Sequence, residues 1–230
     1  MPNRDRTLLR ILIRAVAVAL LLTTAACESD RQPSTEEPVQ SEPVADGRKV
    51  IVAMGDSLTA GLGVTPEESY PALLERLLAD NGYDYRVINA GISGETSSGA
   101  RSRVDWILRL KPAIVILETG ANDGLRGIDP ALVEENIEQM VIEFKRQGVT
   151  IVLAGMMMVT NLGEEYVAAF NRIYPQIARK HDLILMPFFL QDVAADPSKN
   201  QADGIHPNSD GYRIIASNLL PFVVQAIQRE

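Results

Sequence analysis

Three polar side chains in two segments of the chain are of the types that nucleophilic catalysis requires. Ser57 follows Gly55 and Asp56 directly after an apolar run, and Asp203 precedes His206 by three residues near the C-terminus. A serine hydroxyl is too weakly acidic to attack unaided at neutral pH, and imidazole is the side chain whose pKa suits a base there. A carboxylate three residues upstream could bond Nδ1 of the imidazole and leave Nε2 for the serine. The spacing therefore indicates a serine nucleophile, a histidine base and an orienting aspartate.

Each of these segments, taken alone, is also typical of ordinary local structure. Serine and aspartate are frequent helix N-caps, so Ser57 could simply begin a helix. Asp203 could be a capping residue beside a surface histidine, with Pro207 in a first helical turn. The chain has one other histidine, His181, which follows two basic residues at the end of a helical pattern. We expect His181 to interact with the helix dipole and to have a structural role.

Acyl transfer also needs hydrogen-bond donors for the negative charge that develops on the carbonyl oxygen. Candidate donors are the backbone N–H of Gly91, the side-chain amide of Asn122 and the backbone N–H of Ser57. Glycine lets a substrate oxygen come close to the backbone. Because Gly and Asn are also common in turns, a turn is the alternative for Gly91 and Asn122. We find no His/Asp cluster with metal-site spacing and expect neither a metal nor a cofactor.

The elements that must position these residues alternate between short apolar runs and longer segments of helical period. Strands are predicted at 50–54, 85–89, 113–118, 150–154 and, more weakly, 183–186. Helices are predicted near 70–81, 100–110, 130–147, 164–180 and 209–228. This pattern is typical of a parallel sheet covered by helices, in which ligands bind outside the carboxyl ends of the strands. We predict an α/β fold, a three-layer α/β/α sandwich with a five-stranded parallel sheet of flavodoxin-like type.

The first 26 residues have the order of a secretory signal peptide. A basic stretch at 1–14 is followed by a short apolar run at 15–22 and small residues before Cys27. The apolar run is too short to span a bilayer. Because residues 24–27 resemble a bacterial lipobox, we predict a signal peptide of lipoprotein type at 1–26 and lipidation of Cys27. A plain signal peptide that leaves Cys27 as a stray thiol is the alternative.

Residues 27–46 are acidic, contain prolines and lack aromatic side chains. Such a segment cannot bury enough apolar surface to offset its ordering entropy, so we predict a disordered tether before a folded domain at 47–230. The formal net charge of −8 argues against nucleic acid as a partner. We expect an exported monomer, held by lipidated Cys27 at the periplasmic or extracytoplasmic face of a bacterial membrane.

Four blocks of the chain together resemble the SGNH (GDSL) hydrolase family. They are Gly-Asp-Ser-Leu at Ser57, the segment that holds Gly91, Gly-Ala-Asn-Asp around Asn122, and Asp203-Gly-Ile-His206. The residues at 55–64, 91–97 and 120–127 are similar to the TesA-like branch, a group of acyl-CoA thioesterases, lysophospholipases and arylesterases. The resemblance implies a triad of Ser57, Asp203 and His206, oxyanion donors from Ser57, Gly91 and Asn122, and no cofactor.

The expected activity is that of a serine esterase or thioesterase that forms a covalent acyl-Ser57 intermediate. Its expected substrates are acyl thioesters and lysophospholipid, aryl or short-to-medium acyl esters. The apolar residues expected to line an acyl channel are Leu125, Ile128, Met156, Met157, Met158 and Val159. For the methionine run, core packing is an equal alternative, and Trp106 is expected in the core. The alternative functions are a carbohydrate O-acetyl esterase with the same triad and a noncatalytic ligand-binding lipoprotein.

Overall fold

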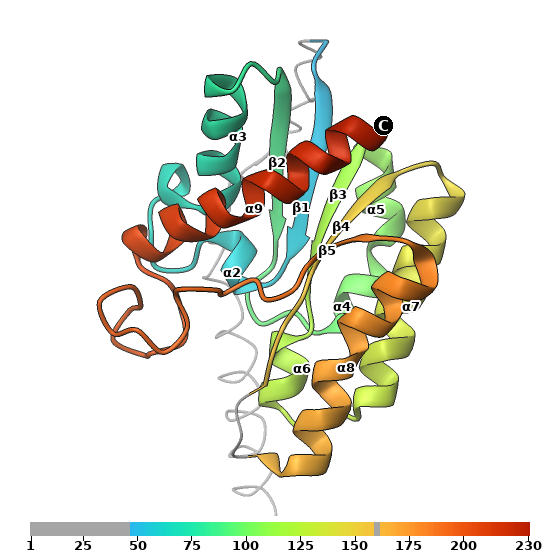
Figure 1. Ribbon diagram of the computed structural model, residues 1–230, viewed down its shortest axis with the longest axis vertical. Coiled ribbons are helices and arrows are strands. Elements are labelled where there is room, and N and C mark those ends of the chain that lie inside the picture. Colours follow the sequence, from blue (N-terminus) through green and yellow to red (C-terminus); the bar gives the residue numbers. More distant parts are fainter. Residues whose placement is uncertain (1–46, 159–161) are drawn as a thin grey trace, which may run out of the picture. The chain divides into compact units, whose positions relative to one another are not determined.

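The computed structural model describes residues 47–158 and 162–230, which contain a five-stranded parallel sheet (Figure 1). The strands are β1 (Lys49–Gly55), β2 (Tyr85–Gly91), β3 (Ile114–Glu118), β4 (Thr150–Ala154) and β5 (Ile184–Met186). Their order in the sheet is β2-β1-β3-β4-β5, and every neighbouring pair is parallel. Since β1 and β3 are neighbours, the winding of the chain reverses between them, and this switch point is where open α/β sheets bind ligands.

Helices cover both faces of the sheet. On one face lie α3 (Tyr70–Asp80) and α9 (Ser209–Arg229), and on the other lie α4 (Ser97–Ser102), α5 (Val104–Arg109), α7 (Pro130–Arg146) and α8 (Glu164–His181) (Figure 1). Three short elements are α2 (Ser57–Ala60), η1 (Pro66–Glu68) and α6 (Ala121–Leu125). The predicted three-layer α/β/α sandwich is therefore confirmed.

The core follows from the composition of the strands. Strands of a parallel sheet are buried on both faces, so they are continuous apolar runs and do not alternate with polar residues. All five residues of β3 are buried, as are the last five of β1 and the last four of β4. The one charged residue among them is Glu118, at the carboxyl end of β3.

The segment predicted as one helix at 100–110 forms two helices instead. α4 begins at Ser97, and Arg103, with φ −112° and ψ 13°, separates it from α5. The Arg103 guanidinium binds Glu95 and the carbonyl oxygen of Gly55, which draws the chain towards β1 at this point. The prediction that Trp106 lies in the core is wrong, because Val104 and Ile107 form the buried face of α5 and Trp106 is 43% exposed.

The predicted signal peptide, Cys27 and the tether lie outside the described residues. Within the described ranges, no helix combines the length and the apolar character that crossing a membrane requires.

Candidate active site

Ser57 occupies a sharp turn between β1 and α2. A Cβ atom at Gly55 would lie 2.2 Å from Thr59 Oγ1 and 2.3 Å from Glu118 Oε2, so only glycine fits there. The N-cap of α2 is Asp56, whose Oδ1 accepts from the Leu58 N–H at 2.9 Å. Capping is thus done by Asp56, and Ser57, the first residue of α2, is left with its hydroxyl at the carboxyl edge of the sheet.

His206 links Ser57 to Asp203. Its Nε2 lies 2.9 Å from Ser57 Oγ, and its Nδ1 lies 2.6 Å from Asp203 Oδ2. The other carboxylate oxygen of Asp203 accepts from the N–H groups of Ile205 and His206 at 2.9 and 3.0 Å. The cap of α9 is Asn208, which accepts from two N–H groups of the first turn. Asp203 therefore holds the backbone and the ring of His206 and does not cap the helix.

The protonation of this pair follows from its hydrogen bonds. The backbone N–H of His206, followed by its ring N–H and the Ile205 N–H, holds the pKa of Asp203 well below its usual range. A carboxylate can only accept, so the Nδ1 hydrogen points at Asp203 and the Nε2 lone pair faces Ser57 Oγ. This is the arrangement in which imidazole can take a proton from serine.

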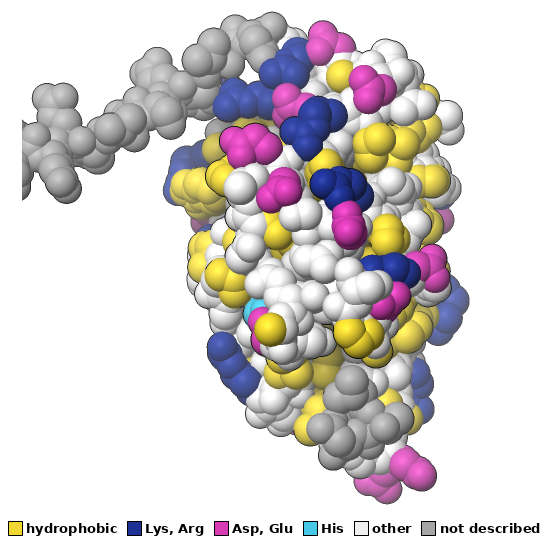
Figure 2. All heavy atoms as spheres, turned by 90° about the vertical axis from the view of Figure 1, so that its left-hand side faces the viewer, with side chains coloured by type: hydrophobic (Ala, Val, Ile, Leu, Met, Phe, Trp, Pro, Cys, Tyr) yellow, Lys and Arg dark blue, Asp and Glu magenta, His cyan; other side chains and the backbone are white. Residues whose placement is uncertain are grey.

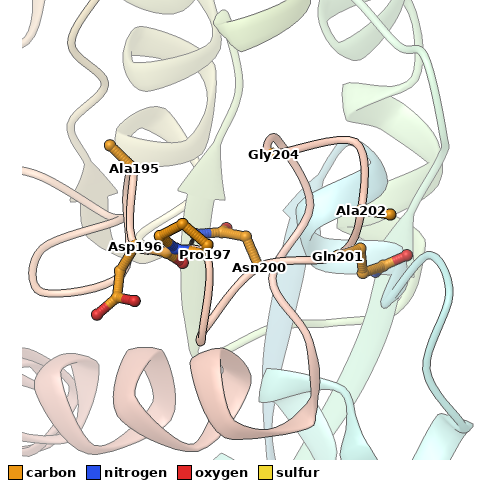
Figure 3. A pocket seen from close by; sticks show the side chains of 7 residues that line it. All are labelled: Ala195, Asp196, Pro197, Asn200, Gln201, Ala202 and Gly204. Carbon is orange, nitrogen blue, oxygen red and sulfur yellow. Dashed lines mark hydrogen bonds between the residues drawn. The ribbon is translucent and has the colours of Figure 1, made fainter.

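The loop that carries Asp203 and His206 is fastened to the rest of the site by Gln201. Its side-chain amide donates to the carbonyl oxygens of Leu62 and Pro207 at 2.7 and 2.9 Å, and its N–H donates to His206 O at 2.7 Å. Seven residues between Ala195 and Gly204 line a pocket in this part of the chain (Figure 3). None of the lining residues is Ser57, Asp203 or His206, so this pocket is not the candidate active site.

Asn122 approaches Ser57 from the neighbouring strand connection. Gly120, with φ +102°, turns the chain after β3 so that Asn122 lies in the first turn of α6. The Asn122 Nδ2 donates to Asp56 Oδ2 at 3.0 Å. An amide nitrogen carries two hydrogens, so Asn122 keeps one for a substrate oxygen.

The structure contradicts the expectation that Gly91 is an oxyanion donor. The Gly91 N–H donates to Asn89 Oδ1 at 2.9 Å, so this donor is already used. A Cβ atom at Gly91 would lie 2.1 Å from Ala60 N, which shows that the glycine allows β2 to pack closely against α2. Three residues later, Gly94 has φ +79°, and its N–H meets no acceptor within 47–158 and 162–230.

The loop that contains Gly94 is attached to α6 by polar contacts that the sequence alone did not reveal. Arg126 donates to Gly94 O at 2.9 Å, and the buried carboxylate of Asp123 accepts from the N–H and the hydroxyl of Ser97, both at 2.7 Å. Glu95 forms two hydrogen bonds with Arg103, at 2.7 and 2.6 Å. These contacts hold the loop after β2 beside Asn122.

Most of the residues proposed from the sequence to line an acyl channel are at or near the surface. Leu125 and Met157 are 54% and 50% exposed, and Ile128 and Met158 are partly buried against the core. Met156 is buried in the core, which favours the packing alternative for this residue, and Val159 lies outside the described residues.

Other exposed apolar residues lie in the segments after α2, after β2 and before α9. They include Leu62, Ile92 and Ile205. On the face shown in Figure 2, hydrophobic and uncharged side chains predominate towards the carboxyl ends of the strands, and charged side chains gather mostly over the opposite end. On this face, the end of the molecule that carries the candidate site is therefore poor in charge.

A doubly wound parallel sheet with a serine, a histidine and an aspartate in hydrogen-bond contact at its carboxyl edge defines a serine hydrolase. Residues 53–214 match the profile of the GDSL-like lipase/acylhydrolase family. The chain belongs to this family and is a serine hydrolase that acts on ester bonds.

Similar proteins carry names that agree with this assignment. Esterase TesA of Pseudomonas aeruginosa is 40% identical over 174 residues, which cover 75% of this chain and 87% of that protein. Thioesterase 1/protease 1/lysophospholipase L1 of Escherichia coli (strain K12) is 36% identical over 72% of this chain and 79% of its own. The crystal structure of AlinE4, an SGNH-hydrolase family esterase, superposes with a TM-score of 0.66 at 41% identity, covering 78% of this chain and 97% of AlinE4. The predicted family is confirmed.

Proposed function

We propose that Ser57 is the nucleophile, His206 the general base and Asp203 its orienting carboxylate. The observation that carries this proposal is the continuous line of contacts from Ser57 Oγ to His206 Nε2 at 2.9 Å and from His206 Nδ1 to Asp203 Oδ2 at 2.6 Å. As Ser57 Oγ attacks the acyl carbon, its proton moves to Nε2, and His206 then gives this proton to the leaving alcohol or thiol. Water repeats the two steps and releases the acid from Ser57.

The oxyanion of the tetrahedral intermediate accepts from the Ser57 N–H and the Asn122 side chain. The Ser57 N–H lies in the first turn of α2, where it has no helical partner. The Gly94 N–H takes the place expected of Gly91, because it is unengaged within the described residues and its loop is fastened to α6 by Arg126. Each such donor contributes about 3 kcal/mol to the transition state.

The substrates we propose are acyl esters or thioesters with an apolar acyl chain, lysophospholipids among them. The exposed Leu125 and the partly buried Ile128 follow Asn122 closely in the chain. The partly buried Met158 packs against Gly124 of the same segment, and the exposed Met157 precedes it. The relatives named as esterase and as thioesterase and lysophospholipase support this class. They do not favour a carbohydrate O-acetyl esterase or a noncatalytic lipoprotein.

For the location, we propose export and attachment to a bacterial membrane through lipidated Cys27, with the enzyme as a monomer. The proposal is supported by the order of basic, apolar and small residues before Cys27. Cells that make the full chain and its Cys27→Ala variant should differ in fractionation, with the wild type in membranes and the variant in the soluble extract. An intact mass without acyl groups on the wild type would contradict the anchor.

Labelling with a fluorophosphonate probe tests the proposed nucleophile. The full chain should be labelled at Ser57, and Ser57→Ala should lose both labelling and hydrolysis of p-nitrophenyl esters. Ser102→Ala is the matched control, since Ser102 is an exposed serine whose hydroxyl only donates to Gly99 O. A folded Ser57→Ala variant that is still labelled would exclude Ser57. Rates on esters of increasing chain length would then rank long acyl groups against acetyl.

A further inference from the structure

A pair of buried carboxyl groups lies directly behind Ser57. Glu118 ends β3 and is fully buried, and Asp56 is 1% exposed. The triad does not use Glu118, and a carboxyl group in the interior is costly unless it is paired or neutral. Glu118 lies at the switch point between β1 and β3, next to the turn that carries Ser57. Its burial there therefore needs a reason connected with the site.

Glu118 holds both ends of the short helix α2. Its Oε2 accepts from the Asp56 N–H at 3.1 Å and from the Thr59 hydroxyl at 2.9 Å. The Thr59 oxygen lies 3.1 Å from the hydroxyl of Tyr70, which donates to it because the Thr59 hydrogen goes to Glu118. One oxygen therefore fixes the backbone just before Ser57 and a side chain two residues after it.

Asp56 connects this turn to the oxyanion donor. Its Oδ1 accepts from the Leu58 N–H at 2.9 Å, and its Oδ2 accepts from Asn122 Nδ2 at 3.0 Å. Both contacts need Asp56 as an acceptor, and both favour its carboxylate form. The direction of the Asn122 amide thus depends on where Asp56 lies, and the backbone of Asp56 is held by Glu118.

Two ionised carboxyl groups at this place would lack a counter-charge. The neighbours of Glu118 on the helices around it are the hydroxyls of Tyr70, Tyr174 and Tyr212, which are neutral at ordinary pH. Arg103, which donates to Gly55 O beside this turn, is paired with Glu95. The second oxygen of Glu118, Oε1, is buried and has no hydrogen-bond partner among the described residues, where a negative charge would be unsolvated.

The two carboxyl groups respond differently to this environment. Burial, and then the charge of Asp56, raises the pKa of Glu118 well above its ordinary value. Burial also raises the pKa of Asp56, but the Leu58 N–H and the Asn122 amide oppose this rise. These opposing influences favour Glu118 over Asp56 as the member of the pair that holds a proton.

We propose that Glu118 is a positioning residue that works as a neutral carboxylic acid, holding α2 and, through Asp56, aligning the Asn122 amide with Ser57 Oγ. This inference rests on the proposed function of Ser57 and Asn122. Ionisation of Glu118 places a second negative charge beside Asp56 and disturbs the turn that carries the nucleophile. The rate of hydrolysis should then fall at alkaline pH because Glu118 ionises, and not because a residue of the triad changes its charge.

Comparing Glu118→Gln with Glu118→Leu distinguishes a requirement for a neutral hydrogen-bond acceptor at this position from a requirement for a side chain that only fills space. Glutamine stays uncharged at every pH and keeps an acceptor for Asp56 N–H and Thr59, so its kcat at neutral pH should stay within about threefold of wild type. Leucine leaves both donors unpaired, and the resulting misplacement should lower kcat by about 10²-fold with little change in KM. Glu138→Gln, far from the site, is the matched control for the Glu-to-Gln change.

The dependence of kcat on pH distinguishes the proposed role of Glu118 from a purely structural one, because a structural role would not change the shape of this dependence. In wild type, kcat should fall on the alkaline side as Glu118 ionises, and this fall should be absent from Glu118→Gln. Identical alkaline limbs in the two proteins would overturn the proposal, as would a Glu118→Gln variant that is as inactive at neutral pH as Glu118→Leu.

An infrared difference spectrum of wild type against Glu118→Gln at pH 8 tests the proton without any substrate. It should contain the carbonyl stretch of a protonated carboxylic acid, and a carboxylate signal alone would overturn the proposal even if Glu118→Leu does not fold. Failure of Ser57 to react with fluorophosphonate would instead remove the proposed function, so the two failures are distinguishable.

Discussion

The two histidines of the chain each lie 2.6 Å from a carboxylate, but in very different parts of the molecule. His206 contacts Asp203 in the loop before α9, and His181 contacts Glu138 where α8 lies beside α7. The two rings are about equally shielded, with side chains 18% and 16% exposed. Distance and burial therefore do not separate the proposed catalytic pair from the other pair.

The difference lies in what else each pair contacts. The second nitrogen of His206 faces Ser57 Oγ, and Asp203 is held by backbone N–H groups, so the ring has one orientation and one target. Glu138 instead shares its Oε1 with Lys180 at 2.6 Å. His181 ends α8, and its ring links this helix to Glu138 of α7. A histidine–carboxylate pair can act as a general base only when the second ring nitrogen of the histidine faces a nucleophile, as it does in His206 and not in His181.

The largest expected effect comes from exchanging each histidine for glutamine. His206→Gln removes the proposed base, and kcat for p-nitrophenyl esters should fall by about 10⁴ to 10⁶-fold. His181→Gln should leave kcat unchanged, because its ring contacts neither Ser57 nor the loops around it. Stopped assays with both variants, checked for folding by circular dichroism, decide this. Equal losses of kcat in His206→Gln and His181→Gln would mean that both histidines support the folded state and that neither has a special role in the reaction.

A smaller but still large effect should follow from neutralising each carboxylate. Asp203→Asn can donate to Nδ1 and so favours the wrong tautomer of His206, which in a serine triad costs about 10⁴-fold in kcat. Glu138→Gln should retain full kcat. Measuring kcat and KM for both variants tests whether orientation of the ring requires a carboxylate. An Asp203→Asn variant with wild-type kcat would show that the backbone contacts alone position His206.

The elements of the fold could be predicted because their signals are local. Apolar β-branched runs predicted all five strands to within two residues at either end, including the weak one that became β5 (Ile184–Met186). The break at Arg103 was missed since it depends on Glu95 and on Gly55, which lies 48 residues away. Helical periodicity carries no information on such a contact.

The site shows the same division between local and distant information. Residue type and spacing, together with the resemblance of four blocks to a known family, selected Ser57, Asp203 and His206, which the structure brings together. They could not reveal that Asn89 already occupies the N–H of Gly91, because Gly91 and Gly94 look equivalent in a glycine-containing loop. Glu118 was visible only as an acid that ends an apolar strand, and its partners lie 62 and 59 residues earlier.

The smallest expected effect concerns the stability that the pair of His181 and Glu138 contributes. Lys180, and after it His181, lowers the pKa of Glu138, so the folded state favours the carboxylate. This stabilisation is present above the ordinary carboxyl pKa and is lost as the pH falls through the lowered value of the folded state. Glu138→Gln should therefore lower Tm by only a degree or two at pH 7, as expected for a surface pair of about 0.5 kcal/mol. The difference from wild type should shrink in acid, and thermal melts at pH 7 and pH 3 measure it. A gap that stays constant over this range would show that the carboxylate charge of Glu138 has no part in holding α7 to α8.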